Sequence, residues 1–81
     1  MLSFTVITRE GCDLCDEMLL ELERFCSGQA AHIRVVDVDA DPLLSTRYGL
    51  KVPVLLLDDQ PVCHGRFDAE EVARLIRRYR T

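Results

Sequence analysis

Two cysteines separated by two residues, Cys12 and Cys15, constrain this chain more than any other feature. They lie between an apolar run that predicts a strand, residues 4–8, and a segment of helical periodicity, residues 14–26. The first sulfur therefore falls at a helix N-terminus, where unpaired backbone N–H groups and the helix dipole favour a thiolate. The second lies one turn along, close enough to attack a mixed disulfide on the first. The spacing predicts a redox-active dithiol, although the same pair is also half of a typical zinc site.

Length and charge exclude several classes of protein. The chain has 81 residues, which allows one domain, residues 1–81, and no second core. Its formal net charge of −4 argues against nucleic-acid binding. Its apolar runs are too short to span a bilayer, and residues 1–8 lack the pattern of a signal peptide, so we expect no membrane association. We therefore expect a cytoplasmic protein, and a monomer, in a compartment where thiols stay reduced.

The remaining thiols and histidines predict no metal site. Cys26 falls on the apolar stripe of the first helix and is expected to be a buried small hydrophobe. Cys63 is expected either to be buried in the same way or to be an exposed thiol. Cys63 and His64 are adjacent in an expected strand and point to opposite faces, so they would not both join Cys12 and Cys15 around one zinc ion.

Periodicity and capping residues predict the order β-α-β-α-β-β-α. Strands are marked by β-branched or continuous apolar runs, and helices by apolar stripes and by Asp caps at Asp41 and Asp68. The expected elements are strands at 2–8, 32–38, 52–57 and 61–64, and helices at 14–26, 42–48 and after residue 68. The first two strands are joined through a helix and should pair in parallel, whereas the tight turn at 58–60 should make the last two antiparallel.

This order and several local motifs resemble the thioredoxin superfamily, and most closely its small bacterial glutaredoxin-like proteins. The motifs are the segment 12–15, the run 36–42 with Tyr48-Gly49-Leu50 after it, and Lys51-Val52-Pro53 before the third strand. The resemblance covers nearly the whole chain. It implies an α/β fold with a four-stranded mixed sheet flanked by three helices, in which the first strand is central.

The resemblance also implies which residues act. Cys12 would be the nucleophile and Cys15 the resolving cysteine. The Val52-Pro53 bond would be cis and face the cysteines, and its backbone would pair with an extended substrate. Arg9 stands where glutaredoxins place a cation for a glutathione carboxylate. Gly65 and Arg66 stand where a Gly-Gly pair receives the γ-glutamyl end, so that turn matches only in part.

The sequence thus predicts a thiol–disulfide oxidoreductase that reduces protein or glutathione mixed disulfides. We expect no bound cofactor, with glutathione as a co-substrate at most. Asp13 and Leu14 replace the Pro-Tyr usual between glutaredoxin cysteines, and an acid beside the nucleophile disfavours the thiolate. The alternative is a non-catalytic module of the same fold in which Cys12 and Cys15 bind a metal ion or an iron–sulfur cluster.

Overall fold

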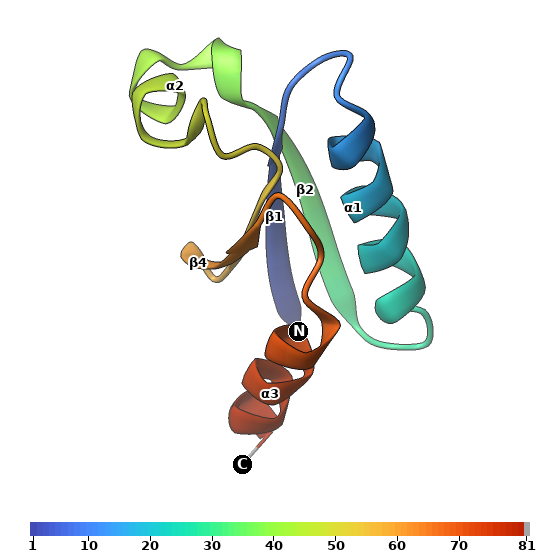
Figure 1. Cartoon of the computed structure of the whole chain (residues 1–81). Helices are drawn as coiled ribbons and strands as arrows, with labels where there is room; N and C mark the ends of the chain where they lie inside the picture. Colours follow the sequence, from blue (N-terminus) through green and yellow to red (C-terminus); the bar gives the residue numbers. More distant parts are fainter. Residues whose placement is uncertain (81) are drawn as a thin grey trace.

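The computed structural model describes residues 1–80, with side chains through residue 78. Its elements follow the expected order, with one added 3-10 turn, η1 (Figure 1). They are β1 (Leu2–Thr8), α1 (Asp13–Phe25), β2 (Ala31–Asp37), η1 (Val38–Ala40), α2 (Pro42–Tyr48), β3 (Val54–Leu57), β4 (Gln60–His64) and α3 (Ala69–Arg80). No helix in residues 1–80 is long and apolar enough to cross a membrane.

The four strands form one mixed sheet in the order β2-β1-β3-β4, which places the first strand in the interior as expected. β1 is parallel to β2 and antiparallel to β3, and β3 is antiparallel to β4. The turn between β3 and β4 is tight because Asp58 and Asp59 both take positive φ angles, 48° and 66°. Positive φ at both central residues matches the right-handed twist of the two strands.

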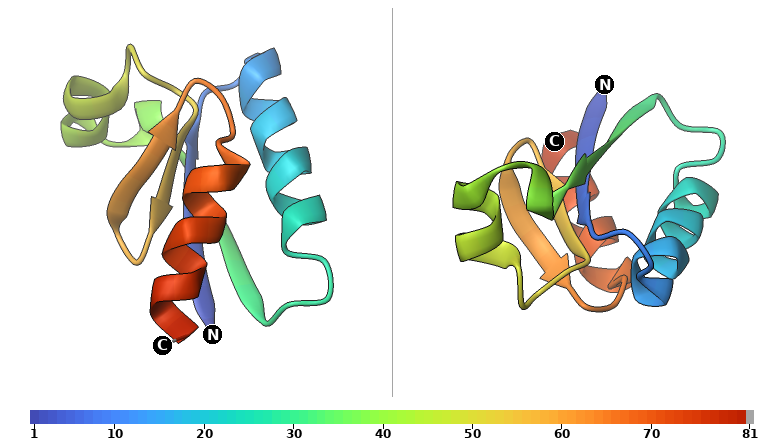
Figure 2. Two further views of the ribbon diagram at one scale, coloured as in Figure 1. Left: turned by 60° about the horizontal axis from the view of Figure 1, so that its bottom comes forward. Right: turned by 90° about the horizontal axis from the view of Figure 1, so that it is seen from above.

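Helices cover both faces of the sheet, with α1 and α3 on one side and α2 on the other (Figure 2). A hydrophobic core lies on each face of the sheet, and the alternation of side chains along β1 explains why there are two. Phe4 and Val6 point toward α1 and α3, whereas Ile7 points toward α2. β3 supplies both cores in the same way, and all four of its residues are buried. The continuous apolar run of β3 is therefore explained by a strand buried on both faces.

Four predicted elements were misplaced by one or two residues at one or both ends. The second strand begins at Ala31, not at residue 32, and the fourth begins at Gln60, not at residue 61. The third strand begins at Val54, not at residue 52, because Pro53 has no N–H to donate to the sheet. The second strand ends at Asp37, whose side chain accepts the backbone N–H of Asp39 and so begins η1. The first helix spans Asp13–Phe25, one residue earlier than expected at each end, because Cys12 itself is the N-cap.

Candidate functional site

The two cysteines of the candidate site are joined in a disulfide at the start of α1, with their Cα atoms 5.2 Å apart. Cys12 has an extended backbone, and its Sγ accepts the backbone N–H of Cys15 at 3.1 Å. A sulfur at this position lies among the unpaired N–H groups of the helix terminus, which favour negative charge. The loop from β1 reaches this position through Gly11, whose φ is 74°.

The two sulfur-bearing residues differ in accessibility. Cys15 is 1% exposed and lies on the buried side of α1, whereas Cys12 is partly exposed. Between them, Leu14 is 51% exposed. An incoming thiol or disulfide therefore reaches Cys12 first, and Cys15 can attack only from inside the protein.

The loop that contains Val52 and Pro53 leaves the sheet beside the cysteine loop. β1 and β3 are antiparallel with Ile7 opposite Val54, so the residues after Ile7 and those before Val54 emerge at the same end of the sheet. The Val52–Pro53 peptide bond is cis. Pro53 is buried, whereas Val52 is partly exposed and precedes the first residue of β3.

The turn after β4 joins this group. The backbone N–H of Gly65, whose φ is 77°, donates to the carbonyl of Pro53 at 2.8 Å. Gly65 and Arg66 also line a pocket of about 290 Å³ together with Leu14, the residue between the cysteines. Six of the seven residues predicted for the site, Cys12, Cys15, Val52, Pro53, Gly65 and Arg66, therefore lie toward the end of the sheet where the loop from β1 to α1 emerges. Gly65 is bonded to Pro53, and Arg66 shares a pocket with Leu14.

Arg9, the seventh, is directed elsewhere. Its Nε and Nη2 donate to the two carboxylate oxygens of Asp39 at 3.0 and 3.1 Å, and its Nη1 donates to the Gly49 carbonyl at 2.9 Å. All three guanidinium nitrogens therefore contact the protein itself. The hydrogen bond and charge of Asp39 raise the pKa of Arg9, and the hydrogen bond from Arg9 lowers the pKa of Asp39.

Sequence reasoning missed Asp39, although a signal for it was present. β1 and β2 pair in parallel with Thr8 opposite Asp37, so the residues that follow each strand are neighbours. An arginine just after one strand and an aspartate just after the other are of opposite charge and within reach. Gly49 is also required here: a Cβ on it would lie 2.4 Å from the Ser45 carbonyl oxygen and 3.5 Å from Arg9 Nη2.

The other two cysteines lie outside the site. Cys26 is buried in the core beneath α1, and this burial raises the pKa of its thiol. Cys63 is half-buried; burial raises its pKa, the charges of Asp68 and Glu71 add to that rise, and a hydrogen bond from the Asp68 backbone opposes it. Both thiols are therefore less ionised at neutral pH than an ordinary cysteine.

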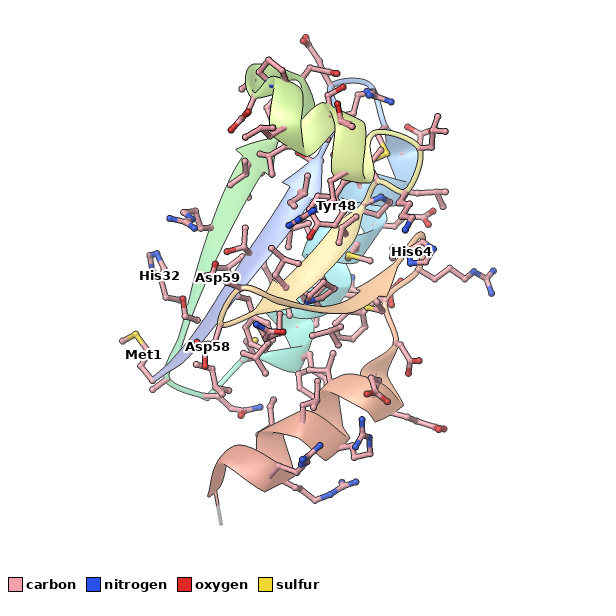
Figure 3. The ribbon with its side chains drawn as sticks, turned by 90° about the vertical axis from the view of Figure 1, so that its left-hand side faces the viewer. Met1, His32, Tyr48, Asp58, Asp59 and His64 are labelled. Atoms are coloured by element: carbon pink, nitrogen blue, oxygen red, sulfur yellow. A yellow bond between two sulfur atoms is a disulfide. The ribbon has the colours of Figure 1, made fainter. Side chains whose placement is uncertain are left out.

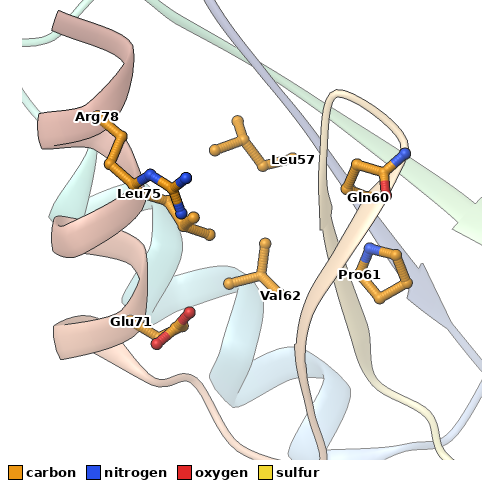
Figure 4. A pocket seen from close by; sticks show the side chains of 7 residues that line it. All are labelled: Leu57, Gln60, Pro61, Val62, Glu71, Leu75 and Arg78. Carbon is orange, nitrogen blue, oxygen red and sulfur yellow. The ribbon is translucent and has the colours of Figure 1, made fainter. Parts of the chain in front are cut away.

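A separate groove of about 460 Å³ lies between the β3–β4 hairpin and α3 (Figure 4). Its walls are largely apolar on the strand side, with two charged side chains on the helix. The residues around it are Leu57, Gln60, Pro61, Val62, Glu71, Leu75 and Arg78. None of the seven predicted site residues is among them.

Fold and site together define a protein of the thioredoxin fold with a CxxC disulfide at the start of its first helix. Residues 3–77 match the family model described as Glutaredoxin-like domain (DUF836). The chain therefore belongs to this glutaredoxin-like family.

Solved structures agree with this assignment. Protein Ne2328 from Nitrosomonas europaea, a solution NMR structure, is 29% identical with a TM-score of 0.83, over 91% of this chain and 89% of that one. The structural genomics target protein XcR50 from X. campestris is 28% identical with a TM-score of 0.64, over 90% of this chain and 93% of that one. Thioredoxin 1 from Thermosipho africanus, at 22% identity and a TM-score of 0.64 over 95% and 92%, shows the same fold. No curated protein matches the chain.

Proposed function

We propose that this protein is a thiol–disulfide oxidoreductase that reduces disulfide bonds of protein substrates. The single observation behind the proposal is the asymmetric pair at the start of α1: a partly exposed Cys12 capping the helix and a Cys15 that is 1% exposed and bonded to it. This arrangement separates the attacking thiol from the resolving thiol.

The reaction balances with these two residues alone. The Cys12 thiolate attacks one sulfur of a substrate disulfide, the substrate S–S bond breaks, and the departing thiolate takes a proton from water. Cys15, after giving its proton to solvent, attacks Cys12 Sγ. The mixed disulfide then breaks, the second substrate thiol leaves, and the Cys12–Cys15 disulfide remains. Two electrons have passed to the substrate, and an external dithiol or two external monothiols restore the reduced pair.

Exposed apolar side chains beside the site support a protein substrate. Leu14 is 51% exposed between the cysteines, and Leu50 is fully exposed just before the Val52-Pro53 segment. Leu14, between the cysteines, and Leu50, two residues before Val52, offer apolar contact to an extended polypeptide. Val52, which precedes β3, would pair its backbone with such a segment.

The proposal is tested by following reduction of insulin disulfides with dithiothreitol as electron donor. The protein should accelerate the reaction, Cys12→Ser should abolish the acceleration, and Cys15→Ser should accumulate a mixed disulfide with insulin detectable by mass spectrometry. Cys63→Ser is the matched control, because it removes a thiol outside the site. The absence of acceleration by the unaltered protein, or an equal loss in the Cys63→Ser variant, would contradict the proposal.

A further inference from the structure

The guanidinium of Arg9 is the cation nearest in sequence before Cys12, and it is already bound. Arg9 lies three positions before Cys12, so the chain between their Cα atoms spans at most about 11 Å. About 11 Å is also the length of an extended tripeptide, so a tripeptide thiol bonded to Cys12 could reach Arg9. The Asp39 carboxylate holds this guanidinium through two hydrogen bonds, and the Gly49 carbonyl accepts a third.

We propose that Asp39 is a positioning residue that determines substrate specificity: it holds Arg9 against η1 and thereby withholds from the redox site the cation that an anionic thiol such as glutathione would require. The inference rests on the proposed function, because it concerns which thiols exchange with Cys12. In this arrangement the site favours protein disulfides over glutathione.

The charges around Cys12 support the inference. Glu10 and Asp13 flank it in sequence, and Asp16 lies in the first turn of α1. Glutathione has two carboxylates and one ammonium group at neutral pH, so it is repelled by these acids unless cations offset them. Arg66, in the pocket beside Leu14, offers one such charge, so Arg9 would be needed for the second carboxylate. Arg9 paired with Asp39 contributes no net charge.

The pair is accessible enough for one substitution to open it. The Arg9 and Asp39 side chains are 39% and 53% exposed, so both are hydrated and neither is locked into the core. Without the carboxylate, Arg9 retains the hydrogen bond from its Nη1 to the Gly49 carbonyl. The freed guanidinium can then turn toward an anion at Cys12, where it offers a forked donor geometry that suits a carboxylate.

The reaction to be measured is reduction of the Cys12–Cys15 disulfide by glutathione. A glutathione thiolate attacks Cys12 Sγ, the Cys12–Cys15 bond breaks, and Cys15 leaves as a thiolate that takes a proton. A second glutathione thiolate attacks the glutathionyl sulfur, which yields oxidised glutathione and the Cys12 thiolate. Two glutathione molecules thus supply the two electrons. The rate is read by acid quenching, alkylation and mass spectrometry.

The experiment compares the unaltered protein with Asp39→Asn, Asp39→Ala and the double variant Arg9→Gln/Asp39→Ala. Each rate with glutathione is divided by the rate with dithiothreitol, which has no carboxylate. Asp59→Asn is the matched control: it removes the same charge in the β3–β4 turn, at the end of the sheet with Met1 and His32 and far from α2 (Figure 3). Thermal unfolding of every variant verifies that it is folded.

We expect the glutathione-to-dithiothreitol ratio to rise about fivefold in Asp39→Ala, the scale of one partly exposed charge interaction, and less in Asp39→Asn. The rise should vanish in the double variant and in Asp59→Asn. It should also vanish when the glycyl carboxylate of glutathione is esterified, a result that a purely structural role of Asp39 would not produce.

Two outcomes would overturn the reasoning at different levels. An unchanged ratio in Asp39→Ala, or a rise that persists without Arg9, would refute the role of Asp39 and leave the proposed function intact. Failure of the unaltered disulfide to react with dithiothreitol at all would instead refute the proposed function.

Discussion

The reduced protein should react with limiting iodoacetamide first at Cys12, and the structure gives the reason. The perturbation is reduction by a dithiol, followed by removal of the reductant and addition of less than one equivalent of reagent. Alkylation requires a thiolate that the reagent can reach. Cys12 is partly exposed at the N-cap of α1, whereas Cys15 is 1% exposed on the buried side of the same helix.

The expected preference is large. The backbone N–H of Cys15 lies 3.1 Å from Cys12 Sγ, and this donor is available to a Cys12 thiolate. A hydrogen bond to a charged group is worth about 1.5–3 kcal/mol, which corresponds to roughly 10- to 150-fold in the thiolate population. Burial of Cys15 adds to the difference. Cys26 and Cys63 are internal references, since burial raises the pKa of both thiols.

The assay is tandem mass spectrometry of tryptic peptides. Cleavage after Arg9 and Arg24 places both site cysteines in one peptide, residues 10–24, and fragment ions between them assign the label. Cys26 and Cys63 fall in separate peptides. We expect Cys12 to be labelled first, then the half-buried Cys63, with Cys15 and Cys26 last. Faster labelling of Cys15 than of Cys12, or of Cys63 ahead of both, would refute the assignment of Cys12 as nucleophile.

Two further predictions concern stability. Leu22→Ala should lower the free energy of unfolding, measured by urea titration, by about 2–5 kcal/mol, because Leu22 is 0% exposed in the core beneath α1. Leu20 is 48% exposed, so Leu20→Ala should change the free energy of unfolding by no more than about 0.5 kcal/mol. Equal losses in the two variants would contradict the core assignment. Because Arg9 lowers the pKa of Asp39, the carboxylate should stabilise the folded state above pH about 4 and lose this effect as the pH falls through its lowered pKa. The urea midpoint of the unaltered protein should thus exceed that of Asp39→Asn at pH 7, and the difference should shrink as the pH falls below about 4. A difference that grows on acidification would contradict this sign.

The sequence by itself determined the features that depend on near neighbours. Apolar alternation and β-branched runs locate the strands, and the caps at Asp41 and Asp68 locate the helices that follow them. The apolar stripe of the first helix includes Cys15 and so predicts a buried sulfur there, whereas Cys12 stands before that stripe, at the start of the helix. These are properties of one strand or one helical turn, so a few adjacent residues are enough to specify them.

Only the tertiary structure decided the partners of Arg9. Its two contacts lie 30 and 40 residues along the chain, at Asp39 and Gly49, and they depend on the register of β1 with β2 and on where α2 ends. Sequence position predicted a ligand for a substrate carboxylate, and in the folded chain the guanidinium is hydrogen-bonded to the carboxylate of Asp39. Hydrophobic patterning fixes which face of a strand is buried, whereas the pairing of exposed charges is set by the final packing of distant segments.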